Sequence, residues 1–189
     1  MKHLAKWIIA AIVVLAVIIC VSTSVYTVAE NEYACVVRFE IISTTDTPGL
    51  HFKVPFIDGV KRFPKAVMLY DISPSEVLTS DKQNMTVDSY VLWEISDPLK
   101  FYQTLGTIPV AEQRLDALTY NALKTIMGTL AQRDIINEDD AMGRNDIYAG
   151  IASNVAELAD TYGIQIVDIK IKRFDLPEAN EQAVYARMI

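Results

Sequence analysis

The most distinct feature of the hydropathy pattern is an apolar run from Trp7 to Ala29, which contains no charged residue. As a helix it would rise about 34 Å, slightly more than the ~30 Å hydrocarbon core of a bilayer. A helix that is apolar on every face over this length is not typical of a water-soluble core. The run therefore predicts a transmembrane anchor.

A cleaved secretory signal peptide is the alternative interpretation of this run, with Ser22 and Ser24 marking the cleavage site. We favour a retained anchor, because Val25, Tyr26 and Val28 continue the apolar character past that site. Lysines precede the run and glutamates follow it, so the positive-inside rule predicts a cytoplasmic tail and places the rest of the chain outside the cytoplasm.

Strand-like patterns follow the run. The segment from Tyr33 to Phe39 is rich in strand-forming residues, and Pro48-Gly49 and Asp58-Gly59 are turn signals around a predicted hairpin. Further strands are expected at residues 66–70 and 85–95. The alternation in 85–95 leaves both faces partly apolar, so we expect this strand to be covered on both sides.

The predicted hairpin carries a group of apolar side chains close to the anchor: Phe52, Val54, Phe56, Ile57 and Phe63. One interpretation is that they fill the core of a small β domain. The other is that the first four contact the bilayer, with Phe56 and Ile57 at the turn entering its interface.

At residue 97 the pattern changes from strands to helices. Asp97 suits an N-cap and Pro98 the first helical position, and a longer helix is predicted from Val110 to Met127. A third helical pattern stops at Gly163.

A half-buried strand follows from Gln165 to Arg173, with Val167, Ile169 and Ile171 predicted on its buried face. The basic residues of the opposite face are expected to be exposed, or to meet an acidic neighbour in an oligomer.

The fold class predicted from these patterns is α+β. The chain would comprise a tail at 1–6, an anchor at 7–29, a β-rich domain at 30–96 and an α/β domain at 97–176. Residues 177–189 would begin a C-terminal helix that looks truncated, because no stop signal precedes Ile189.

Composition limits the function classes. The whole chain has a formal charge of −7, and the part after the run is more acidic still, because Lys2 and Lys6 precede it. This balance argues against nucleic acid and against electrostatic attraction to anionic lipid. Cys20 and Cys35 lie in different environments, so a stapling disulfide is not expected.

Candidate catalytic chemistry is sparse. His3 and His51 are the only histidines, so neither a zinc cluster nor any other cofactor or metal is expected. The sequence has no nucleophile elbow, P-loop or metalloprotease helix. The acidic residues Glu138, Asp139 and Asp140 are interpreted as a solvated loop, with cation binding as the alternative. An undetected Ser/Lys or carboxylate hydrolase site remains an open alternative.

Several segments together resemble the stomatin, prohibitin, flotillin and HflK/HflC superfamily, known as SPFH or band 7. The matching segments are Pro48 to Phe56, Leu78 to Asp81, Val87-Asp88, Asp97-Pro98, Phe101-Tyr102, Arg114 to Asp116, Tyr162 to Ile164, Val167 to Arg173 and Leu176 to Glu178. Glu40 departs from the family, which tends to have glycine there.

The resemblance implies a β-rich SPFH1 domain on the membrane, an α/β SPFH2 domain and a long coiled-coil helix. Similar proteins of the bacterial inner membrane assemble, often with an HflK-like homologue, into large rings or cages that regulate an FtsH-like AAA protease. A non-catalytic scaffold is therefore the expected function. A flotillin-like organiser of membrane microdomains is the alternative within the family.

Overall fold

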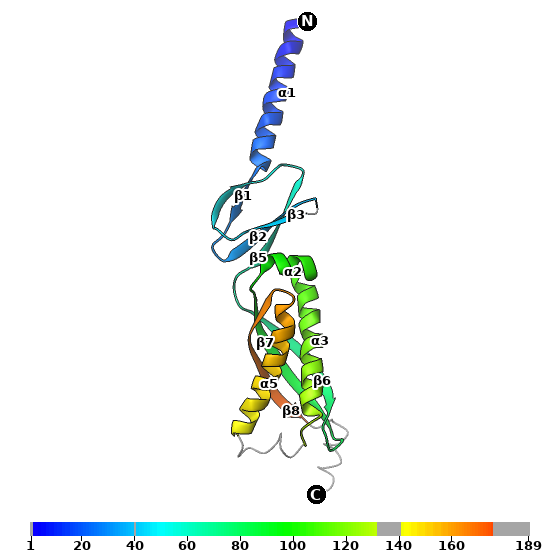
Figure 1. The fold of residues 1–189 in the computed structure, drawn as a ribbon. Coiled ribbons are helices and arrows are strands. Elements are labelled where there is room, and N and C mark those ends of the chain that lie inside the picture. Colours follow the sequence, from blue (N-terminus) through cyan, green and yellow to red (C-terminus); the bar gives the residue numbers. More distant parts are fainter. Residues whose placement is uncertain (1, 40, 132–140, 176–189) are drawn as a thin grey trace. The chain divides into compact units, whose positions relative to one another are not determined.

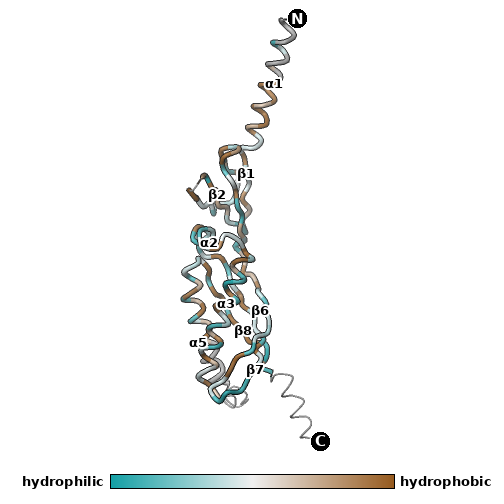
Figure 2. The backbone as a smooth tube through the Cα atoms, turned by 90° about the vertical axis from the view of Figure 1, so that its right-hand side faces the viewer, coloured by the Kyte–Doolittle hydropathy of each residue, from teal (hydrophilic) through white to brown (hydrophobic). Residues whose placement is uncertain are grey.

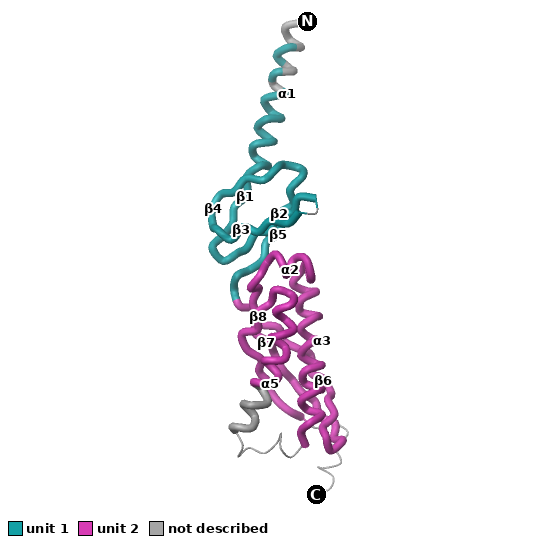
Figure 3. The backbone as a smooth tube through the Cα atoms, viewed as in Figure 1, with its two compact units in different colours: residues 1–66 teal, residues 67–189 magenta. Residues whose placement is uncertain are grey.

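The computed structural model describes residues 2–39, 41–131 and 141–175 (Figure 1). The chain divides into two compact units, Met1–Ala66 and Val67–Ile189 (Figure 3). This division falls earlier than the predicted boundary at residue 96, because β6 pairs with β7 and β7 pairs with β8, and none of these strands pairs with the described strands of unit 1. The predicted C-terminal helix at 177–189 and the acidic segment Glu138 to Asp140 lie outside the described residues.

Unit 1 begins with helix α1 (Lys2–Thr23) and continues directly into strand β1 (Val25–Val28). The Thr23 hydroxyl donates to the Ile19 carbonyl at 2.8 Å, so a side chain satisfies one of the last carbonyls of the helix. The helix therefore ends at Thr23, before the predicted end of the anchor at Ala29, because the β-branched and aromatic residues that follow form strand β1. Among the helices of the described residues, none is both long and apolar enough to cross a membrane.

The rest of unit 1 is antiparallel β structure. Strand β1 pairs with β4 (Gly49–Phe52), and a separate sheet has the order β3-β2-β5, formed by β3 (Ile41–Thr45), β2 (Glu32–Arg38) and β5 (Asp58–Pro64). Residues from both sheets build one small core: Tyr26, Val28, Ala34 and Val36, with Val60 packed against them. The two sheets are thus joined by burial of apolar side chains.

Unit 2 is a sheet with helices against one face. Its strands are β6 (Met68–Leu78), β7 (Asn84–Ile95) and β8 (Ile164–Asp175), and they pair antiparallel in the order β6-β7-β8. Its helices are α2 (Pro98–Thr104), α3 (Ile108–Met127) and α5 (Ala141–Asp160). The mixture of helices and strands confirms the α+β class.

The predicted alternation of the central strand β7 is confirmed. Every second residue from Met85 to Ile95 is buried, and the buried helix residues Leu115, Leu123 and Val155 complete the core of this unit. The opposite face of β7 is only half-buried. The expectation that both faces are covered is therefore wrong within the described residues, where the helices lie on one side of the sheet (Figure 1).

The predicted face of β8 also needs one correction. Val167 is 49% exposed, whereas Ile169 is buried. The register between β7 and β8 shifts after the pair Leu92 and Asp168, and Trp93 then lies opposite Ile166. This β-bulge turns Val167 out of the period-two pattern.

The start of α2 and the end of α5 meet at one tight junction. The Asp97 carboxylate accepts hydrogen bonds from the Leu99 and Lys100 amides, both at 3.0 Å, which confirms the predicted N-cap. Gly163 has a φ of +74°, and a Cβ there would lie 2.5 Å from the Asp97 carbonyl oxygen. Only glycine satisfies both the backbone conformation and the space at this position.

Candidate functional site

Apolar side chains that face solvent are the main candidate functional feature of unit 1. The predicted hairpin around Asp58-Gly59 is wrong, because β4 pairs with β1, β5 pairs with β2, and Asp58-Gly59 begins β5. Of the apolar residues assigned to it, Phe52 is 82% exposed, Phe56 85%, Ile57 48% and Val54 38%, whereas Phe63 is 5% exposed. The core interpretation therefore holds for Phe63 and is wrong for the other four. Because these four side chains are exposed, the remaining interpretation is that they contact the bilayer or another molecule.

Three more exposed apolar residues of unit 1 were missed from the sequence. They are Phe39, Ile41 and Leu50, each at least 70% exposed. Leu50 and Phe52 flank His51, whose ring instead lies 5.6 Å from that of the buried Tyr26. The period-two pattern of this strand was visible in the sequence, but it does not tell which of its two faces is buried.

We call the seven exposed large apolar residues that follow α1 in the described part of unit 1 the apolar surface: Phe39, Ile41, Leu50, Phe52, Val54, Phe56 and Ile57. Part of it lies at one end of the β3-β2-β5 sheet, because Arg38 pairs in register with both Ile41 and Asp58. Another part adjoins α1, because Phe52 pairs with Val25, which begins the strand after that helix.

An ion pair holds the loop that carries Phe56 and Ile57. The Arg38 guanidinium donates to both Asp58 carboxylate oxygens, at 2.7 and 2.8 Å, and the Val54 amide donates to Asp58 Oδ2 at 2.8 Å. The hydrogen bonds from Arg38 and then from Val54 lower the pKa of Asp58 to about 2. A carboxylate that stays charged thus closes the loop at its base.

Backbone strain accompanies the exposed aromatic residues. Phe39 has a φ of +55° and Phe56 has a φ of +67°; residues other than glycine rarely adopt this region of backbone conformation. Both residues flank the Arg38–Asp58 pair and both are more than four-fifths exposed. The paired charges support a loop conformation that presents the aromatic rings to the outside.

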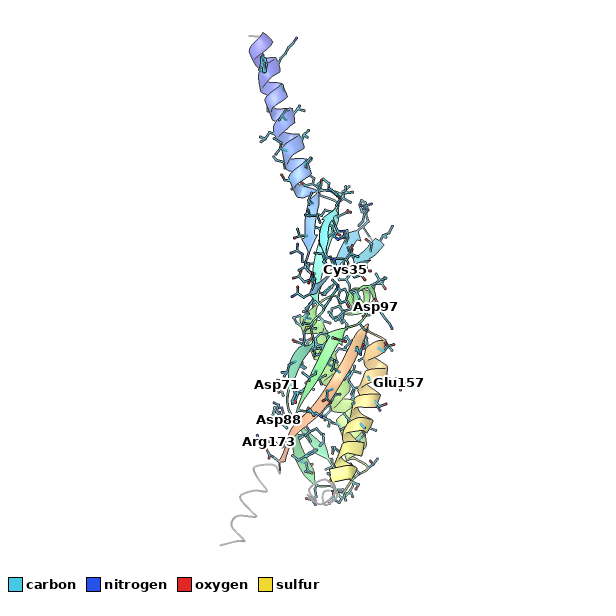
Figure 4. The ribbon with its side chains drawn as sticks, turned by 90° about the vertical axis from the view of Figure 1, so that its left-hand side faces the viewer. Cys35, Asp71, Asp88, Asp97, Glu157 and Arg173 are labelled. Carbon is cyan, nitrogen blue, oxygen red and sulfur yellow. The ribbon has the colours of Figure 1, made fainter. Side chains whose placement is uncertain are left out.

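The basic residues of β8 pair within the chain. Lys172 Nζ lies 3.0 Å from Asp88 Oδ1 and also contacts Asp71, so this β8 side chain is paired with residues of both other strands of the sheet. Asp71 and Asp88 are labelled in Figure 4. Lys170 pairs with Asp168 at 3.2 Å. The hydrogen bond with Asp71 and then that with Asp88 raise the pKa of Lys172.

Within residues 2–39, 41–131 and 141–175, no group of three or more His, Cys, Asp or Glu is placed to hold a metal ion. Cys35 is buried. A shallow hollow in unit 2 is lined by Arg114 and Tyr162, and the Arg114 Nε donates to the Tyr162 hydroxyl at 2.9 Å. This hydrogen bond joins α3 to the turn that follows α5.

The sequence model of the SPFH domain / Band 7 family matches residues 26–189, and the chain belongs to this family.

Within the family, the chain is similar to proteins named HflC. It is 29% identical to the "Modulator of FtsH protease HflC" of Escherichia coli K12, over 93% of this chain and 66% of that protein. It is 28% identical to "Protein HflC" of Haemophilus influenzae, over 89% and 60% of the two chains, and 24% identical to "Protein HflC" of Treponema pallidum, over 87% and 60%. The chain thus spans about two thirds of the length of these relatives or slightly less.

Proposed function

We propose that this chain is a non-catalytic membrane scaffold that modulates an FtsH-like AAA protease. The observation that carries the proposal is the similarity to HflC over 93% of the chain, because that relative is named as a modulator of the FtsH protease. Since the similarity covers both units, modulation of the protease is proposed for the chain as a whole and not for one of its units alone.

Helix α1 is proposed as the anchor of this scaffold on the basis of the full sequence, which has no charged residue between Lys6 and Glu30, although the described residues alone include no helix long and apolar enough to cross a membrane. Its 22 residues would rise about 33 Å, close to the thickness of a bilayer core. Its large apolar side chains from Ile12 to Val21 are each about half exposed or more, so the strands of unit 1 do not cover them. Figure 2 shows the hydrophobic colour along this part of the helix. The lysines before the run favour an N-terminus on the cytoplasmic side of a bacterial inner membrane, with the strands of unit 1 and the whole of unit 2 outside the cytoplasm.

The apolar surface is proposed to rest in the membrane interface. Phe52 pairs with Val25, and the Lys53 amide donates to the Ser24 carbonyl at 2.7 Å, so this part of the surface begins where the anchor ends. Aromatic and aliphatic side chains in the interface gain free energy by leaving water. The two aromatic residues held with positive φ, Phe39 and Phe56, would then be exposed to lipid and not to water.

Assembly is the second part of the proposal. We propose that the chain forms a large oligomer, with an HflK-like homologue as a companion, and that the assembly controls access to the protease. The half-buried outer face of the β6-β7-β8 sheet supports the presence of a neighbour, because Leu69 and Val167 remain exposed beside its ion pairs.

Gentle detergent extraction of the membrane-expressed full chain, followed by size analysis and identification of companions, tests this function. We expect a particle of megadalton order that contains a second SPFH protein and an AAA protease. A large particle without the protease would instead identify a microdomain organiser. A monomer without companions would refute the scaffold, and labelling with an active-site serine probe would then test a hydrolase.

A further inference from the structure

A basic hollow lies in unit 1 beside the end of α1. Its volume is about 660 Å³, and its lining residues are Val25, Tyr26, Thr27, Lys53, Val60, Lys61 and Arg62. They come from β1, from the segment after β4 and from β5, so only the folded unit brings the three cationic side chains together. We call this site the basic hollow.

The positions of its cationic residues are set by hydrogen bonds to the segment that follows the helix. Arg62 Nη2 donates to the Thr27 carbonyl at 3.1 Å, which holds the guanidinium against β1. The Lys53 amide donates to the Ser24 carbonyl at 2.7 Å, so the backbone of this lysine lies beside the first residue after α1. Lys61 is exposed on the edge strand β5.

The lining of the hollow contains three cationic residues and no acidic residue. The buried carboxylate of Asp58 forms its bidentate pair with Arg38, and the charge of Lys53 also acts on it from a distance. Acidic and basic residues are equal in number over residues 24–66, so the negative charge of the chain resides in residues 67–189. The whole-chain charge therefore does not describe the field at this site.

We propose that the basic hollow binds the phosphate of an anionic phospholipid headgroup. This inference rests on the proposed membrane anchoring by α1, since a hollow that starts at Val25 would then lie at headgroup depth. Lysine and arginine are the side chains that recognise phosphate, arginine through its planar fork and lysine as a point charge. Because the lining offers no carboxylate for a choline or ethanolamine ammonium, the site selects phosphatidylglycerol over zwitterionic lipids.

The test uses the purified full chain in a neutral detergent and three soluble probes. These are dihexanoyl-phosphatidylglycerol, dihexanoyl-phosphatidylcholine and inorganic phosphate, titrated by calorimetry. We expect saturable binding of phosphatidylglycerol, with both other probes at least about tenfold weaker, since each lacks either net charge or the glycerol ester. Binding of inorganic phosphate as tightly as the lipid would overturn the headgroup assignment.

Variants then locate the binding site. Lys61→Gln is the main variant, because this exposed side chain lies in the lining and its removal leaves the Arg62–Thr27 hydrogen bond in place. We expect about a fivefold loss of affinity for each cation removed, and about a hundredfold loss when Lys53→Gln and Arg62→Gln are added. Lys65→Gln is the matched control, since it removes one positive charge of unit 1 outside the hollow.

Equal loss in the control and in Lys61→Gln would show unspecific attraction and overturn the site, as would the absence of saturable lipid binding. Carbonate extraction of the membrane-expressed chain separates this result from failure of the proposed function. If the chain is released by carbonate, the anchor itself is wrong. If it is retained and shows no headgroup preference, only the basic hollow is wrong.

Discussion

Replacement of Gly163 by alanine tests the junction on which unit 2 is built. The new Cβ would lie 2.5 Å from the Asp97 carbonyl oxygen and 2.9 Å from the Phe101 amide nitrogen, and both are backbone atoms that cannot turn away. The left-handed φ of +74° alone costs alanine about 1–2 kcal/mol.

The collision adds to that cost. To relieve it, Gly163 must move from Ser96 and Asp97, whose amides donate to the Gly163 carbonyl at 3.0 and 3.2 Å. Loss of these two hydrogen bonds costs about 1 kcal/mol each. We therefore expect Gly163→Ala to lower the free energy of unfolding of unit 2 by about 3–4 kcal/mol.

Gly106→Ala is the matched control for this prediction. Gly106 has the same φ of +74°, but the nearest atom to its added Cβ, the Tyr102 carbonyl oxygen, is 3.7 Å away. This control should lose only the conformational part, about 1–2 kcal/mol. Urea unfolding followed by the fluorescence of the buried Trp93 measures both values in the full chain. Equal losses in the two variants would refute the close-packing argument at Gly163.

Three further predictions concern single features of the two units. Hydrogen bonds lower the pKa of Asp58 to about 2, so its contribution to stability is complete above about pH 4 and is lost as the pH falls toward 2. Unfolding measured as a function of pH tests this in the wild type, and Asp58→Asn should lack the acid-induced loss. The double variant Phe56→Ser, Ile57→Ser should change the stability of unit 1 by less than about 0.5 kcal/mol but reduce depth-sensitive labelling of the loop by lipid probes. Phe63→Ser, at a buried position, should instead lower the stability by at least about 3 kcal/mol. Unchanged labelling in the double variant would refute membrane contact. Leu115→Ala, at a fully buried position of α3, should cost about 3 kcal/mol in urea unfolding, and a loss below about 1 kcal/mol would contradict the described core.

Local chemistry made several parts of the fold predictable. The N-cap at Asp97 and the glycine stop at Gly163 depend on residues within one turn, so sequence neighbours suffice to recognise them. The alternation of β7 was predictable because one face of the strand is buried along its whole length. The family could likewise be recognised from short segments in a fixed order, and the matched range of 26–189 agrees with that recognition.

Other parts depended on partners far away in the chain. The composition of Val25–Val28 fits a membrane anchor and a strand equally well. These residues form a strand because they pair with β4. The boundary between the units lies at residue 66 and not at 96, because β6 pairs with β7, and β7 pairs with β8, which lies some seventy residues further on. The bulge that exposes Val167 is a property of the β7–β8 register and has no local signal.

The candidate site shows the same division. The amino-acid order by itself determined that Phe52, Val54, Phe56 and Ile57 are apolar, close to the first helix and next to turn signals, because these are properties of neighbouring residues. Only the tertiary structure decided that they face outward, and that Lys53, Lys61 and Arg62 share one hollow. Burial and the local electrostatic field are sums over residues that folding brings together, so no stretch of sequence contains them.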